Sequence, residues 1–210
     1  MKKIVLVADL VGSRNLSNRG AVQKRLDACL SQLSAGKRDG LVSPYTITLG
    51  DEFQAVFSSP GRIFRDALAI LIALYPVEVR FAWSLGEITT GVNTKQAIGM
   101  DGPAFHDSRK TVEALKKAKQ LFAVTGLSAD VQMLADRSLE LVSHLLKKWP
   151  RSRLVILKRV GEQADVGAIA RELRVTDQAV YKSIEAGAIR TIVPLFEEIV
   201  RNIGHELGEP

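Results

Sequence analysis

Acidic side chains end two strand-like segments of this sequence, and their placement suggests chemistry that depends on a divalent cation. Asp9 follows the apolar run 4–8, whereas Asp51 and Glu52 follow Gly50 in a short turn. Adjacent acids at such a tip need water or a cation beside them, because like charges repel. Two strand-end carboxylates separated by one helix are typical of sites where Mg²⁺ assists chemistry on phosphate groups. Asp9 and Asp51 are therefore candidate metal ligands.

The elements that must position these acids follow from the hydrophobic pattern. The pattern predicts the following elements in this order: a strand at 3–9, a helix from about Asn18, a hairpin, a helix at 60–75 and an alternating strand at 77–85. This β-α-β-β-α-β order is that of the ferredoxin-like fold. There the second hairpin strand lies antiparallel beside the first strand, so Asp9 and Asp51 should meet at one sheet edge. The alternative is a doubly wound parallel sheet, against which the short hairpin argues.

The remainder of the chain is predicted to be mainly helical, so the fold class is α+β. Helices are expected at about 103–118 and 129–148, with a strand at 121–124 between them and a domain break at Pro150. We expect a sheet domain at 1–126, a connecting helix at 127–150 and an all-α domain at 151–210. The last helix has a broad apolar face, which predicts a homodimer interface: Ile189, Ile192, Val193, Phe196, Ile199, Val200 and Ile203.

Residues 165–184 fit a helix-turn-helix motif. Its expected core is Ile169, Leu173, Val175, Val180 and Ile184. Thr176 would cap the second helix, which is the one that enters the major groove in such motifs. Candidate DNA contacts are Arg171, Arg174, Thr176, Gln178, Tyr181 and Lys182. The alternative is a helical hairpin that packs on the first domain or on a second subunit.

Composition limits the other possibilities. The net charge of +6 comes from the first 125 residues, and basicity of this size alone indicates solubility rather than nucleic-acid binding. The one cysteine, Cys29, excludes an internal disulfide and fits a reducing cytoplasm. No apolar segment approaches the ~20 residues needed to cross a membrane. We therefore expect a cytoplasmic protein without a membrane partner.

Three motifs resemble those of the SatD family: residues 8–14, 49–53 and 99–105. Residues 1–125 are also similar, more distantly, to the palm domain of class III nucleotide cyclases and GGDEF cyclases. This resemblance implies bound Mg²⁺ or Mn²⁺. Its ligands would be Asp9, Asp51, Glu52 and the main-chain carbonyl of Leu10. It further implies a nucleotide near Gly12, Ser13, Arg14, Gly50, His106 and Arg109.

Departures from the cyclase pattern favour a binding domain over an active enzyme. Leu49 replaces the first glycine of the GGDEF turn, and His106 with Arg109 or Lys110 stands where cyclases carry an Asn and an Arg. The leading hypothesis is a regulator whose cyclase-like domain binds a metal and a nucleotide and controls a DNA-binding helix-turn-helix. The alternative is a Mg²⁺-dependent nucleotidyl- or phosphoryl-transfer enzyme, a phosphorus–oxygen lyase if it cyclises, with the helical region as an oligomerisation module.

Overall fold

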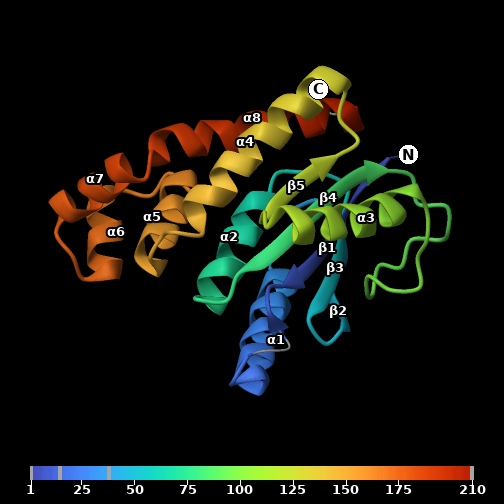
Figure 1. The fold of residues 1–210 in the computed structure, drawn as a ribbon, viewed down its shortest axis with the longest axis horizontal. Helices are drawn as coiled ribbons and strands as arrows, with labels where there is room; N and C mark the ends of the chain where they lie inside the picture. Colours follow the sequence, from blue (N-terminus) through green and yellow to red (C-terminus); the bar gives the residue numbers. More distant parts are fainter. Residues whose placement is uncertain (1, 14–15, 37–38, 209–210) are drawn as a thin grey trace.

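The computed structural model describes residues 2–13, 16–36 and 39–208 (Figure 1). The strands are β1 (Lys3–Leu10), β2 (Leu41–Leu49), β3 (Glu52–Phe57), β4 (Val79–Gly86) and β5 (Phe122–Thr125). The first four helices are α1 (Arg19–Ala35), α2 (Ile63–Leu74), α3 (Pro103–Ala118) and α4 (Ala129–Leu146). The C-terminal helices are α5 (Arg151–Gly161), α6 (Val166–Leu173), α7 (Asp177–Ala186) and α8 (Ile189–Leu207).

The sheet confirms the predicted α+β, ferredoxin-like arrangement. Its strand order is β2-β3-β1-β4-β5, in which β1 pairs antiparallel with both β3 and β4. The fifth strand, β5, extends the sheet parallel to β4. Because β3 runs back along β1, the tip of the β2–β3 hairpin lies at the carboxyl end of β1, where the backbone N–H of Leu10 donates to the carbonyl of Asp51 (3.1 Å).

Side-chain alternation divides the sheet into two buried faces. One face packs on α1, α2 and the C-terminal helices, and its β1 residues are Ile4, Leu6, Ala8 and Leu10. The other face packs on α3, and its β1 residues are Val5 and Val7. Since successive side chains of a strand point to opposite faces, Asp9 belongs to the face covered by α3.

The C-terminal helices share the core of the sheet rather than forming a separate one. The rings of Phe64 on α2 and Phe196 on α8 stack with centroids 4.2 Å apart, and Phe196 also meets Phe122 of β5 edge-on. The expected interface on the last helix was wrong in its location. Its central side chains are buried within this chain and cannot cover a second subunit: Ile189, Ile192, Phe196, Ile199 and Ile203.

One smaller difference from the sequence expectations concerns a helix boundary. The helix expected from Pro60 begins at Ile63, after a turn in which the backbone N–H of Ile63 donates to the carbonyl of Pro60. Near the two ends of the described chain, Lys2 Nζ lies 3.5 Å from a carboxylate oxygen of Glu206. Within the described residues, no helix has the length and apolar character needed to cross a membrane.

Candidate metal and nucleotide site

Asp9 lies where three strands and one helix meet. Across the sheet it stands directly opposite Glu52 of β3 on one side and Arg80 of β4 on the other. Its Oδ2 accepts a hydrogen bond from Arg80 Nη1 at 3.0 Å, and Lys116 Nζ of α3 lies 3.7 Å from the same oxygen. The Asp9 residue is 7% exposed. Asp9 is thus a nearly buried acid with two cationic neighbours.

Burial decides the protonation behaviour of this acid. It raises the pKa of Asp9 above the ordinary value of 3.8, and the cations Lys116 and Arg80 oppose the shift without cancelling it. The charge of Asp51 makes a smaller contribution in the same direction as burial, raising the pKa of Asp9. Burial alone would lower the pKa of Lys116, but a hydrogen bond to Glu113 and the charge of Asp9 raise it.

Asp51 is held by the loop that follows β1. Its Oδ2 accepts a short hydrogen bond from the hydroxyl of Ser13, a residue that is itself buried. Gly12 and Gly50 both have positive φ, 66° and 58°, which a side-chain-bearing residue rarely adopts. The two glycines therefore fix the loop and the hairpin turn that bring Ser13 and Asp51 together. Arg14 lies outside the described residues.

A groove of about 370 Å³ lies on the α3 side of the hairpin. Its lining includes two residues expected at the site, Glu52 and Arg109, together with Leu49, which is 71% exposed at the hairpin tip. The remaining lining residues are Thr48, Gln54, Ile98, Gly99 and Met100. A hydroxyl hydrogen bond from Thr48 to Glu52 Oε1 (3.1 Å) orients that acid. The groove therefore offers a ligand space beside Glu52, although Asp9 and Asp51 do not line it.

His106 is not brought to the carboxylates. It lies in the first turn of α3, where its Nε2 is 3.0 Å from Asp101 Oδ1, and both side chains are exposed. Ten residues of helix separate it from Lys116, a distance of about 15 Å along the axis. The side chain that α3 supplies to Asp9 is Lys116, which the sequence reasoning missed. The available signal was its position four residues after the buried Val112, on the inward face of the helix.

The donor set fits a metal ion that arrives with a phosphate ligand. No group of three or more His, Cys, Asp or Glu side chains suited to a metal occurs among the residues that the structure describes. Mg²⁺, however, is usually held by one or two protein carboxylates together with substrate phosphates. Asp9 and Asp51 would supply those two carboxylates. In addition, Arg80 Nε is buried without a hydrogen-bond acceptor in the described part of the chain, so this guanidinium has a donor to spare for an anionic ligand.

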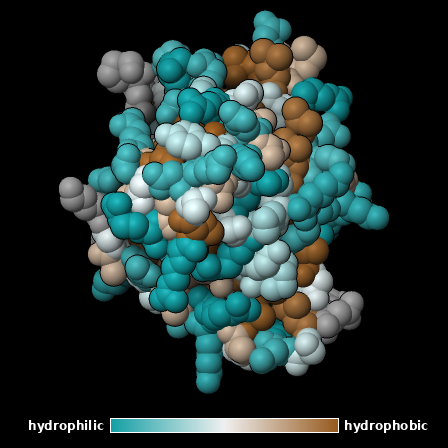
Figure 2. Space-filling model, turned by 90° about the vertical axis from the view of Figure 1, so that its left-hand side faces the viewer, coloured by the Kyte–Doolittle hydropathy of each residue, from teal (hydrophilic) through white to brown (hydrophobic). Residues whose placement is uncertain are grey.

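The helix-turn-helix residues are arranged as expected, with one exception. Thr176 Oγ1 accepts the backbone N–H of Ala179 (3.2 Å), and Arg174 takes the left-handed conformation (φ 56°, ψ 45°) in the turn. The side chains named as DNA contacts are all exposed, including Tyr181 at 48%. Val175 was wrongly assigned to the motif's core: it is 45% exposed, because the left-handed residue before it turns the chain outward. The end of the molecule that carries α6 and α7 is mainly hydrophilic, with only small apolar patches (Figure 2).

Comparison with known sequences identifies the family. The sequence model of the SatD family matches residues 3–191, nearly the whole chain. The chain belongs to the SatD family. No curated protein matches this SatD-family chain.

Among solved structures, this SatD-family protein is similar to two structures of a bacterial light-regulated adenylyl cyclase. The TM-scores are 0.47 and 0.46, and the identities are 16% and 17%. The match covers 60% of this chain but 43% of each cyclase chain, so it spans less than half of their length. The assignment of the palm-like fold in this SatD-family protein rests on the strand order of its sheet.

Proposed function

We propose that this protein is a cytoplasmic, nucleotide-responsive regulator whose palm-like domain binds a nucleoside phosphate together with Mg²⁺ or Mn²⁺. The observation that supports this most directly is the convergence of Asp9 and Asp51 at one sheet edge, with Arg80 and Lys116 beside them. Two acids and two cations in one place match a ligand that contains both a metal ion and phosphate groups.

Each residue has a distinct part in this proposal. Asp9 and Asp51, with Glu52 and the Leu10 carbonyl, would hold the metal, which would neutralise phosphate charge. Arg80 and Lys116, released from Asp9 by that metal, would then pair with phosphate oxygens. Arg109 faces the groove beside Glu52 and would contact the rest of the nucleotide. Ser13 keeps Asp51 in place through its hydroxyl hydrogen bond.

Thermal unfolding tests the binding proposal. We expect the melting temperature to be higher with a nucleoside triphosphate plus Mg²⁺ or Mn²⁺ than with the same nucleotide in metal-stripped buffer. The reason is that a ligand which binds only the folded state stabilises that state. Asp51→Asn should remove this metal-dependent increment, whereas Asp107→Asn, an exposed acid on α3, should keep it. A metal-dependent increment that survives in both Asp9→Asn and Asp51→Asn would refute the proposed site.

The second part of the proposal is DNA binding by α6 and α7 as the output of the regulator. It is supported by the capped, solvent-facing second helix. Fluorescence anisotropy with DNA from upstream of the protein's own gene should show binding that weakens as salt rises, since phosphate contacts release counterions. Lys182→Gln should weaken it, and Arg201→Gln on the exposed face of α8 should not. Absence of DNA binding at low salt would refute the DNA-binding part of the proposal.

The alternative function is catalysis at the same site. In a cyclase-type reaction the ribose 3′-hydroxyl attacks the α-phosphorus and pyrophosphate leaves. Incubation with each nucleoside triphosphate and Mg²⁺ or Mn²⁺, followed by chromatography, distinguishes the two functions. We expect the nucleotide to remain intact, because α3 places His106 far from the carboxylates. Turnover that is abolished by Asp51→Asn would establish the enzyme instead.

A further inference from the structure

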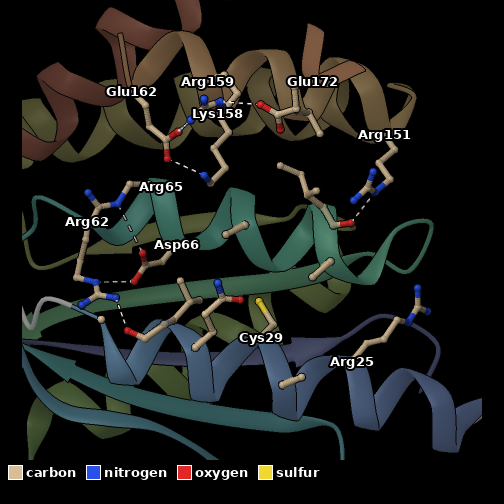
Figure 3. A pocket seen from close by; sticks show the side chains of 18 of the residues that line it. Arg25, Cys29, Arg62, Arg65, Asp66, Arg151, Lys158, Arg159, Glu162 and Glu172 are labelled. Atoms are coloured by element: carbon tan, nitrogen blue, oxygen red, sulfur yellow. Dashed lines mark hydrogen bonds and ion pairs between the residues drawn. The ribbon is translucent and has the colours of Figure 1, made fainter. Parts of the chain in front are cut away.

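A second groove lies on the opposite side of the sheet from Asp9. It has a volume of about 820 Å³ and runs between α1 and α2, which cover the sheet, and α5 and α6 of the C-terminal region (Figure 3). This volume is in the range of small-molecule sites. Small residues on α1 and α2 leave the space open: Ala28, Cys29, Ala69 and Ala73.

The walls of this groove carry more positive than negative charge. The cationic lining residues are Arg25, Arg62, Arg65, Arg151, Lys158 and Arg159, and the acidic ones are Asp39, Asp66, Glu162 and Glu172. Three of the four acids already have cationic partners. Arg62 binds Asp66 (2.6 Å), Lys158 and Arg159 bind Glu162 (2.6 and 2.9 Å), and Arg159 also meets Glu172 (3.0 Å). The remaining positive charge faces the groove.

Three arginines from three different helices carry this excess. Arg25 of α1 and Arg151 of α5 each donate to a main-chain carbonyl at the end of α2, those of Tyr75 (3.4 Å) and Ile72 (3.1 Å). Arg65 of α2 lies 3.8 Å from Asp66 through its Nε. A guanidinium has five N–H donors, so one such contact leaves most of them for a ligand. All three line the same groove, Arg65 at one end and Arg25 and Arg151 at the other (Figure 3).

The spacing of these arginines sets the size of the ligand. Arg65 lies in the first turn of α2, and Arg25 and Arg151 contact its last turn, about 10 Å further along the helix. A single phosphate ion cannot reach both ends, whereas a polyphosphate or a nucleotide can. Arginine forks match phosphate oxygens in paired hydrogen bonds, which favours phosphate over other anions.

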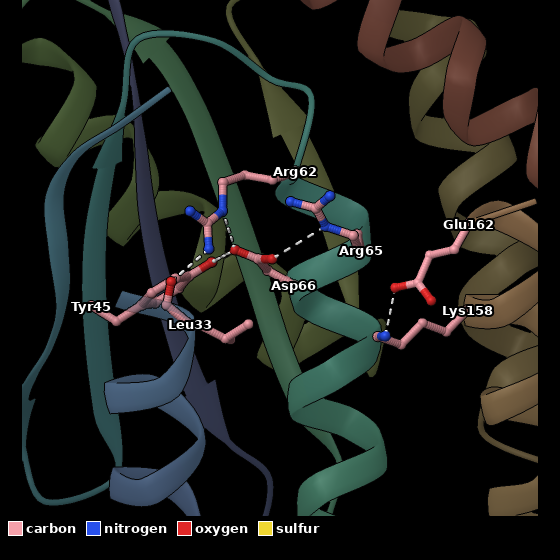
Figure 4. Close-up of polar contacts among 7 residues, drawn as sticks. All are labelled: Leu33, Tyr45, Arg62, Arg65, Asp66, Lys158 and Glu162. Carbon is pink, nitrogen blue, oxygen red and sulfur yellow. Dashed lines mark hydrogen bonds and ion pairs between the residues drawn. The ribbon is translucent and has the colours of Figure 1, made fainter. Parts of the chain in front are cut away.

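One end of the groove is rigid. Arg62 and Asp66 have side chains only 4% and 2% exposed, and the carboxylate of Asp66 also accepts the hydroxyl of Tyr45 (2.9 Å) (Figure 4). Arg62 in turn donates to the carbonyl of Leu33 in α1 (2.7 Å). This network ties α1, α2 and β2 together behind Arg65. A ligand would therefore meet a preformed surface on the sheet side.

We propose that this groove binds a phosphate-bearing small molecule of nucleotide size, without a metal ion. Bound there, the ligand would bridge the helices of the sheet to α5 and to α6, the first helix of the helix-turn-helix. This site is separate from the metal and nucleotide site at Asp9, and the proposal does not depend on that function.

Calorimetric titration of the full chain in metal-stripped buffer tests it, with inorganic tripolyphosphate and ATP as the probes. We expect at least one of them to bind with a stoichiometry of one, and Arg65→Gln and Arg151→Gln each to weaken binding by about tenfold or more. Asp51→Asn and Arg137→Gln, an exposed arginine on α4, should leave the affinity unchanged. Unfolding of the ligand-free variants confirms that each is folded.

Three results would overturn the proposal. The first is no binding of either probe without metal. The second is binding that Asp51→Asn abolishes and Arg65→Gln and Arg151→Gln leave intact, which would assign the anion to the site at Asp9. The third is that Arg65→Gln and Arg137→Gln weaken binding of the probe equally, because non-specific attraction of the anion to the overall positive charge would produce that pattern.

Discussion

At the scale of single residues, the buried pair Arg62–Asp66 shows why an ion pair and a stabilising interaction are different things. Burial raises the pKa of Asp66 above its ordinary value of 3.8, and Arg62 and Tyr45 lower it by less. The favourable interactions of the ionised carboxylate with Arg62 and Tyr45 are therefore smaller than the free-energy cost of removing it from water. The pair aligns α1, α2 and β2 without being a large source of stability.

The removal of one partner of this ion pair should nevertheless destabilise the protein strongly. Asp66→Ala takes the carboxylate away from the buried Arg62 and from the Tyr45 hydroxyl, and we expect a loss of about 3–5 kcal/mol in the free energy of unfolding. Replacement of both charges, by Arg62→Met with Asp66→Leu, should cost far less. Denaturant unfolding measures both, with the exposed Asp27→Asn as the control. A double variant as unstable as Asp66→Ala would contradict this account.

Glu162 predicts a dependence of stability on pH. Burial alone would raise its pKa, but hydrogen bonds from Lys158 and Arg159 lower it below the ordinary value of 4.5. A group with a lowered folded-state pKa stabilises the fold above its unfolded-state pKa, and this contribution is lost as the pH falls through the folded-state value. The melting temperature of Glu162→Gln should therefore fall less steeply on acidification than that of the unsubstituted protein. Parallel curves would show that the two hydrogen bonds contribute nothing.

At the scale of elements, the turn between α6 and α7 combines strain with proposed function. Arg174 has φ 56°, which a glycine adopts without the clash of a Cβ. Arg174→Gly should raise the free energy of unfolding by up to about 1 kcal/mol and weaken DNA binding. Lys119, which has the same φ at the end of α3, provides the matched control. Lys119→Gly should also stabilise the protein but leave DNA binding unchanged. Equal DNA affinity in the two variants would show that Arg174 does not contact DNA.

The elements themselves were largely predictable, because hydrophobic periodicity is a local property. The helix expected at about 103–118 is α3, and the strand order needed to join Asp9 to Asp51 follows from the order of elements. The pattern could not show which surface covers an apolar face. An apolar stripe has the same sequence whether its own chain or a second chain buries it, so α8 was assigned to an interface.

The candidate site was predictable to the same extent. Asp9 lies near the end of β1, and Asp51 lies in the turn just before β3, the strand that pairs with β1, so their proximity required only the topology. Lys116 reaches Asp9 because the segment after β4 returns α3 across the sheet, and no local pattern gives the path of that segment. His106 was expected to contact the nucleotide because of the resemblance to cyclases, and it lies at the other end of α3 from Lys116.

At the scale of the whole molecule, the continuous core predicts one cooperative unfolding transition. Trp83 lies in the sheet and Trp149 between α4 and α5, so each reports on one part of the chain. Trp149→Phe and Trp83→Phe leave one reporter each, and fluorescence and circular dichroism should give coincident midpoints within each variant. Separate midpoints would indicate that the sheet and the C-terminal helices unfold independently.

The ion pair between Lys2 and Glu206 has a practical consequence for handling this protein. Lys2 and Glu206, near the two ends of the described residues, lie at one corner, and α6 and α7 occupy the opposite end of the molecule (Figure 1). A fusion partner, dye or surface attached at either terminus would therefore leave the helix-turn-helix facing free solution. A short peptide could also join the ends, so that new termini opened in an exposed loop should give a circularly permuted chain with the same architecture.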